Sequence, residues 1–267
     1  MLVSNMSAAD IAAWIGAAAW LVPIGQAVHR YVTRPVVTIL PDEWARIGFT
    51  SGGPGLNLRL VFSADRRAVI VDGLEVSLRH EGGEEHRLRW SYLDENLSQI
   101  EDQSGVRSFV TRPQTPIAIK VNTYDLPDKF VRFIEPGWQD VGQGPAKWVR
   151  DQVDFHRKKP KEGFVERMLA SKELFDAIDA RKRFFWWRPG LYYVNFHLSS
   201  PERFRYADIT FSFDLSQESA DALQRNVSVI EGDWEGWIRS FEPGHATYVP
   251  PAGEVWVWPF VRVRKVA

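Results

Sequence analysis

Apolar and polar residues alternate along much of the chain after residue 34, which is the pattern of β-strands with one face in a core. The clearest segment is Leu-Asn-Leu-Arg-Leu-Val-Phe at 56–62. We expect Leu58, Leu60 and Phe62 in that core. Trp90 is expected in the core as well, and so are Phe211 and Phe213 or, alternatively, the residues that alternate with these two.

Turn residues separate these segments. Glu81-Gly-Gly-Glu84 predicts a tight hairpin, because glycine adopts the positive φ that such a turn demands. The expected strands are 34–40, 56–62, 68–71, 74–79, 87–90, 109–111, 117–121, 129–133, 191–198, 208–215 and 254–265. Short strands at regular spacing are typical of a β-sandwich. The pattern therefore predicts a mainly β body that resembles an immunoglobulin-like or arrestin-like sandwich, although the Cys…Trp…Cys spacing of true immunoglobulin domains is missing.

Three segments have helical spacing instead and predict helical insertions at 145–156, at 164–180 and from Ser216 onward, with Ser219 as the alternative start. Trp234, Trp237 and Phe241 fall on one face of the last helix, which predicts core packing or, as a weaker interpretation, a partner-binding surface. The expected parts of the chain are an N-terminal helix (1–33), a first β part (34–140), a helical connector (141–189) and a second β part (190–267). The second β part either packs with the first or forms a second sandwich.

The N-terminal segment Ile11–Val28 carries no charged residue and is about as long as the shortest helix that crosses a bilayer. A signal peptide is disfavoured, because the first ten residues contain no lysine or arginine. A buried helix is the main alternative to a transmembrane helix. We predict a single-pass transmembrane or membrane-associated helix. Ala9, Ala13 and Ala17 form a small-residue face on this helix, through which copies of the chain could associate.

Basic residues follow this helix directly, at His29, Arg30 and Arg34. Lysine and arginine are retained on the cytoplasmic side, so we predict an inner or plasma membrane protein with its N-terminus outside and its body in the cytoplasm. Further basic residues are expected to contact the membrane surface on the same side. The full membrane-surface set is Arg30, Arg34, Lys158, Lys159, Lys161, Arg181 and Arg183.

The segment at 181–188 mixes arginine and lysine with aromatic residues. It predicts a helix end that enters the core with Phe184 and Trp186 buried; lipid contact and single-stranded nucleic acid are the alternatives. The formal net charge of the 267 residues is −1, so a nucleic-acid partner is not expected. The absence of cysteine excludes a disulfide framework.

Candidate chemistry is sparse in this sequence. His80, Glu84 and His86 are weak metal-ligand candidates, which we interpret as a solvated hairpin tip rather than a metal site. The acidic stretch 94–102 predicts a loop or short helix. No nucleophile-elbow, zinc-protease or P-loop motif is present, and neither a cofactor nor catalytic residues can be assigned.

The sequence therefore favours a membrane-anchored cytoplasmic interaction or effector module that binds a protein or a small ligand. Its expected partners are the membrane and a protein, the latter including a second copy of the chain. The alternative is a hydrolase, possibly metal-dependent, whose site assembles only in three dimensions. An enzyme is the less favoured of the two.

Overall fold

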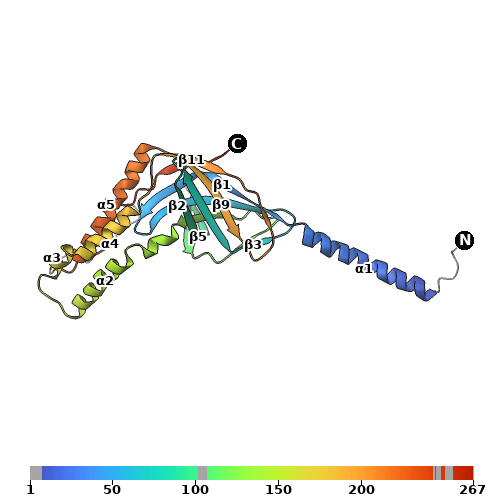
Figure 1. The fold of residues 1–267 in the computed structure, drawn as a ribbon, viewed down its shortest axis with the longest axis horizontal. Helices are drawn as coiled ribbons and strands as arrows, with labels where there is room; N and C mark the ends of the chain where they lie inside the picture. The colour runs from blue at the N-terminus through green and yellow to red at the C-terminus, as the bar shows by residue number, and fades with distance from the viewer. Residues whose placement is uncertain (1–7, 102–106, 243, 245–247, 250–254, 267) are drawn as a thin grey trace.

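The structure, a computed structural model, describes residues 8–101, 107–242, 244, 248–249 and 255–266. A curled β-sheet forms the body, a group of helices projects from one side of it, and the N-terminal helix α1 (Ala8–Val32) leaves at the opposite end (Figure 1). The other helices are η1 (Pro136–Asp140), α2 (Gln143–Lys158), α3 (Phe164–Leu169), α4 (Lys172–Arg183) and α5 (Gln217–Arg239).

Within the described residues, eleven strands form one sheet and two short strands, β3 (Val69–Val71) and β7 (Ile119–Val121), form another. The strands of the large sheet are β1 (Val36–Thr50), β2 (Gly53–Ala64), β4 (Gly73–His80), β5 (Glu85–Glu101), β6 (Arg107–Gln114), β8 (Asp128–Ile134), β9 (Gly190–Ser199), β10 (Arg205–Tyr206), β11 (Phe211–Leu215), β12 (Phe260–Arg262) and β13 (Arg264–Lys265). The main path runs β10-β1-β2-β8-β5-β4-β9-β11-β13, with β12 on β1 and β6 on β5.

The C-terminal segment links the two ends of this path. β12 pairs with β1, and β13, which follows it immediately, pairs with β11. β1 and β11 lie near opposite ends of the strand order, yet the short segment β12–β13 pairs with both. The sheet must therefore curl so that its two ends come close together. Strands from before and after the helical connector share this sheet, since β4 pairs with β9 from Gly73 opposite Ser199 to His80 opposite Tyr192.

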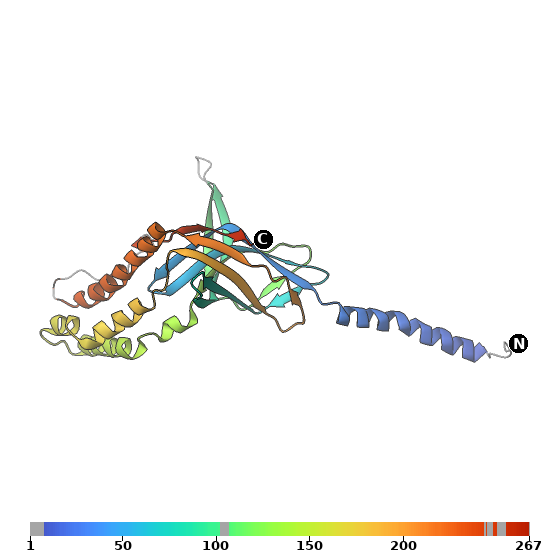
Figure 2. The same ribbon diagram turned by 45° about the horizontal axis from the view of Figure 1, so that its top comes forward.

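The concave interior of the sheet is the core. Leu58, Leu60, Phe62, Phe211 and Phe213 are all buried, as the alternation predicted. Trp90 is buried as well, and Figure 2 shows the strands curving around this interior. The prediction of a mainly β body is confirmed. The immunoglobulin-like or arrestin-like sandwich is not confirmed, because these strands join one curled sheet.

Several predicted strand boundaries are wrong, and the reason is long-range pairing. β1 continues past Leu40 to Thr50, with a register shift between Pro41 and Ala45 that accommodates the proline in a bulge. β5 continues to Glu101 because β6 pairs with it, so the acidic stretch is a strand up to that residue; residue 102 lies outside the described residues.

Two further boundaries are set by side chains. The predicted helix 164–180 is interrupted, since Ser171 caps a new helix by accepting a hydrogen bond from Leu174 N at 3.4 Å. Ser216 caps α5 in the same way and accepts from Ser219 N at 3.2 Å, so Ser216 is the correct one of its two predicted starts. The C-terminal strand begins only at Phe260, because a side chain on α5 binds the backbone just before it.

Helix α1 projects away from the body in both views (Figures 1 and 2). Its side chains at Trp20, Leu21, Val22, Ile24 and Val28 are exposed. Among the residues that the structure describes, no helix combines enough length with enough apolar character to traverse a bilayer, so the predicted transmembrane helix is not confirmed. The side chains at 8–15 and at 17 lie outside the described residues, and the small-residue face of Ala9, Ala13 and Ala17 stays a prediction.

Candidate functional site

A cavity of about 630 Å³ opens where the sheet meets the helical group. Its walls come from the turn between β1 and β2, from β5 and β8, from η1 and α4, and from the segment before β12. The lining residues are Thr50, Ser51, Gly52, Gly53, Gly55, Ser91, Tyr92, Arg132, Ile134, Trp138, Arg181, Trp256 and Trp258. The lining therefore combines two arginines with four aromatic rings and several hydroxyl groups.

Two glycines let the indole rings approach the sheet. A Cβ atom at Gly48 would overlap the six-membered ring of Trp258. Gly53 has a φ of +94°, and a Cβ atom there would lie 2.5 Å from Trp138 Cγ. Trp138 is fixed further by its indole N–H, which donates to the carbonyl oxygen of Ser51 at 3.0 Å. The glycine-rich segment 51–55, which turns from β1 into β2, thus forms one wall of the cavity.

Arg132 lies on β8 and reaches across the sheet. Its Nε donates to Asn57 Oδ1 at 3.2 Å, while its guanidinium carbon lies 5.8 Å from the ring centre of Tyr92 and 5.4 Å from that of Trp258. These contacts are of cation–π type and orient the group without neutralising it. Within the described residues, Arg132 forms no ion pair with a carboxylate.

Arg181 lies in the last turn of α4 and is half-buried. Its guanidinium carbon lies 4.9 Å from the ring centre of Trp234 and 5.9 Å from that of Trp138. Burial, together with the charge of Arg150, lowers the pKa of Arg181. The surroundings therefore disfavour this cation, and an anion beside it would be stabilised.

One acid of the described chain, Asp233, acts on Arg181 without forming an ion pair with it. Asp233 on α5 acts on Arg181 electrostatically, but its carboxylate accepts a hydrogen bond from the Tyr248 hydroxyl, and the described residues show no ion pair between the two. Burial raises the pKa of Asp233, and the charge of Arg181 opposes that rise. Arg181 thus lines the cavity without a direct ion pair among the described residues, and Asp233 offsets its charge only in part.

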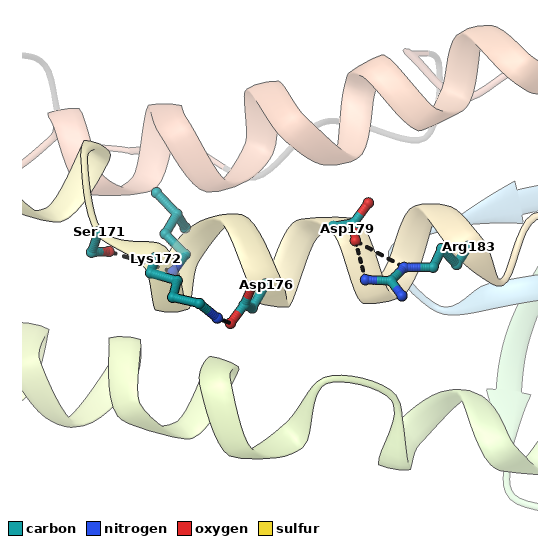
Figure 3. A network of polar contacts seen from close by, with 6 residues as sticks. Ser171, Lys172, Asp176, Asp179 and Arg183 are labelled. Atoms are coloured by element: carbon teal, nitrogen blue, oxygen red, sulfur yellow. Dashed lines mark hydrogen bonds and ion pairs between the residues drawn. The ribbon is translucent and has the colours of Figure 1, made fainter.

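Other charged residues of α4 are paired along the helix surface (Figure 3). Lys172 pairs with Asp176 one turn later, and the Nε of Arg183 donates to Asp179 Oδ2 at 2.8 Å. Such exposed pairs contribute little to stability, because solvent screens them. They distinguish Arg183, whose charge is satisfied by its own helix, from Arg181, whose charge is not.

A buried asparagine holds the last wall in place. Asn226 on α5 is fully buried, and its side-chain amide donates to the carbonyl oxygen of Val257 at 2.8 Å. Its side-chain oxygen accepts from Val257 N at 2.9 Å. This pair of hydrogen bonds takes the place of strand pairing at Val257, and it fixes the segment that carries Trp256 and Trp258.

The predicted membrane-surface residues do not lie together. The helical group projects from the side of the body opposite to α1 (Figures 1 and 2). It contains Lys158, the last residue of α2, and Lys159 and Lys161, which follow α2, whereas Arg34 follows α1 directly. Arg181 lines the cavity and Arg183 is ion-paired, as described above. The side chain of Arg30 lies outside the described residues. These residues therefore do not form one face beside the exit of α1, and their contact with a membrane stays a prediction.

The weak metal candidates are occupied by separate contacts. Glu84 pairs with Arg188 at 3.1 Å, and His80 Nε2 lies 3.1 Å from the carbonyl oxygen of Pro189. His86 stacks on Trp186 with ring centres 3.9 Å apart. In the described part of the chain, no group of three histidine, cysteine or acidic side chains is placed to hold a metal ion.

The aromatic residues of the two predicted clusters pack within the protein. In the segment at 181–188, Trp187 is buried, while Phe184 and Trp186 are half-buried against the core. On α5, Trp234 is buried, whereas Trp237 and Phe241 are partly buried against the same core. Both clusters therefore pack against the core. In the segment at 181–188, however, the most buried ring is that of Trp187, whereas Phe184 and Trp186, which we expected to be buried, are half-buried.

Comparison with protein-family models, with curated proteins and with solved structures found no match. The cavity itself was missed by the sequence prediction, since its parts come from distant segments. The glycines of the segment 51–55 are the local feature that could have indicated it, because glycine permits the close approach of large side chains. Arg181 was predicted at the membrane surface, as one charge in a basic run.

Proposed function

We propose that α1 attaches this protein to a membrane and that the body is a binding module held there. The observation that carries the proposal is the state of α1 in the structure: an apolar helix that projects from the body, with its described side chains, at 16 and 18–29, in solvent. Trp20 and Leu21 are each 68% exposed. Such surface is normally covered by a partner or by lipid.

The distribution of these residues favours lipid over a protein groove. Trp20, Leu21 and Val22 are consecutive, so they point in directions about 100° apart on a helix. A groove in a protein covers only one face of a helix, whereas lipid acyl chains can contact apolar side chains on all sides of it. The basic residues His29 and Arg34 at the body-proximal end suit the headgroup layer. The proposal is attachment through α1 and does not require the helix to cross.

The cavity supports a binding role for the body. Its described lining carries neither a carboxylate nor an imidazole, which are the usual general acids and bases of hydrolases. It carries instead rigid aromatic rings and two arginines, groups that recognise a ligand without transforming it. For this reason we favour binding over the hydrolase alternative.

Co-flotation with liposomes that contain anionic lipid tests the attachment. The full-length wild-type protein should float with the vesicles, and Leu21→Asp with Ile24→Asp should abolish flotation. Each aspartate in an apolar bilayer environment is unfavourable by about 2.5–3.5 kcal/mol. Because α1 does not pack on the body, the unfolding curve of the double variant should match that of the wild type.

Phe175→Asp is the matched control. Phe175 is also a large exposed apolar residue, at 60% exposure, but it lies on α4 in the helical group. This variant should float like the wild type. Flotation that persists in the α1 double variant, or that is lost equally in Phe175→Asp, would contradict attachment through α1.

A further inference from the structure

We propose that the cavity binds a small organic anion, with its phosphate or carboxylate held by Arg132 and Arg181 and its planar ring packed on the tryptophans. The proposal concerns the body and stands independently of how α1 is used. The ligand is proposed to have two joined parts, an anionic group and a ring, because cationic and aromatic side chains line the same cavity.

The charge of the cavity provides the first part of the argument. Arg132 and Arg181 both line it, and no acidic residue of the described chain does. The described residues show no ion pair to either arginine, and Asp233 acts on Arg181 only from outside the lining. The guanidinium group presents its donors as a planar fork that matches the oxygens of carboxylate and phosphate. Hydroxyl groups of Thr50, Ser51 and Ser91 add further donors around the same space.

The rings provide the second part. Trp138, Trp256 and Trp258 line the cavity with Tyr92, and Gly48 and Gly53 leave room for two of the indoles. Stacking of a planar ring on such a surface adds affinity and tolerates different rings. Trp258 already lies over the Arg132 guanidinium, so the aromatic and cationic parts of the site adjoin each other.

The size of the cavity decides the kind of ligand. Its volume of 630 Å³ falls in the range of small-molecule sites, about 300–1,000 Å³. Polymeric nucleic acid is recognised by extended basic surfaces, whereas the formal net charge of this chain is −1. A small molecule with one anionic group and one ring therefore fits both the size and the chemistry of the site.

Isothermal titration calorimetry on the full-length chain, in an uncharged detergent, tests the proposal. The probes are phenyl phosphate and benzoate, each a ring with one type of anionic group, with inorganic phosphate and benzyl alcohol as the separate halves. At least one of the two ring-bearing anions should bind saturably, about tenfold more tightly than either half. Which of the two binds better distinguishes a phosphate ligand from a carboxylate ligand.

Variants assign the binding to this cavity. Arg132→Gln and Arg181→Gln should each weaken the preferred anion about tenfold or more, since each removes a charge-assisted contact. Arg181→Lys retains the charge and should lose less than Arg181→Gln. Trp258→Leu should weaken the ring-bearing anion and leave inorganic phosphate unchanged. Unfolding curves show that each variant is folded before it is titrated.

Arg59→Gln is the matched control, because it removes the same charge from the neighbouring strand β2. Arg59 lies outside the cavity lining and is already paired with Asp128, with Nε to Oδ1 at 2.9 Å. Saturable binding that is lost only in the cavity variants supports the site. Absence of binding of both ring-bearing anions at millimolar concentration, or equal loss in Arg59→Gln, would overturn it.

Discussion

Asn226 connects the fold to the cavity, and its replacement by alanine gives the sharpest prediction about stability. The two hydrogen bonds between Asn226 and the backbone of Val257 are 2.8 and 2.9 Å long and fully shielded from solvent on the asparagine side. They replace strand pairing for a segment whose neighbours on both sides line the cavity. Loss of this contact therefore acts on stability and on ligand binding together.

The magnitude follows from the two bonds. Each typically contributes about 0.5–1.5 kcal/mol net, and a backbone group left buried without a partner is unfavourable by about 1–3 kcal/mol. We expect Asn226→Ala to lower the free energy of unfolding by about 2–4 kcal/mol, since the segment can relax toward solvent and recover part of the loss. Asn226→Asp keeps an acceptor for Val257 N but replaces the donor, so it should also destabilise.

Urea unfolding followed by tryptophan fluorescence measures the change. The midpoint should fall while the slope with denaturant stays constant, because the surface exposed on unfolding is nearly unchanged. Gln224→Ala is the control: Gln224 is exposed on the same helix, and the described contacts give its side chain no hydrogen bond. If Asn226→Ala lost less than about 1 kcal/mol, or if Gln224→Ala lost as much, the two hydrogen bonds would not hold this segment in place.

Three further predictions concern single buried groups. Trp187 is 2% exposed and donates to the carbonyl oxygen of Gly48 at 3.0 Å, so Trp187→Ala should lower the free energy of unfolding by about 3–5 kcal/mol in the same urea assay. The Tyr206 hydroxyl is buried, and the described residues give it no hydrogen-bond partner, so Tyr206→Phe should leave the melting temperature unchanged or raise it; a clear decrease would contradict this. Burial raises the pKa of Asp233 in the folded state, so its ionisation destabilises the fold at neutral pH, and this effect disappears as the pH falls through the folded pKa. Asp233→Asn should therefore be more stable than the wild type at neutral pH, and this difference in stability should be smaller at about pH 4. A stability difference that does not change with pH would argue against the raised pKa. The variant should also bind an anion beside Arg181 more tightly.

The sequence predicted what local patterns determine. Alternation in 56–62 identified core positions, the double glycine at 82–83 identified the hairpin between β4 and β5, and Ser216 identified the start of α5. These features depend on neighbouring residues alone. Each is fixed by the period of side-chain direction, by allowed φ values or by a cap.

The sequence could not predict what distant segments decide together. The continuation of β1 past Pro41 depends on pairing with β2, and the curl of the sheet depends on β12 and β13. The role of Arg181 depends on two indoles, from η1 and α5, that lie far from it in the chain. A basic run carries no signal of such an environment, because charge patterns record composition and not burial.

Amide hydrogen exchange of the full-length protein, measured with and without liposomes, tests directly whether α1 attaches the protein to a membrane. In water, α1 packs on nothing described in the body, so its amides should exchange faster than those of the core strands. With liposomes, protection should rise along α1 and stay unchanged in the sheet. Protection of α1 before lipid is added, or protection that appears on the body while α1 remains fast, would contradict attachment through this helix.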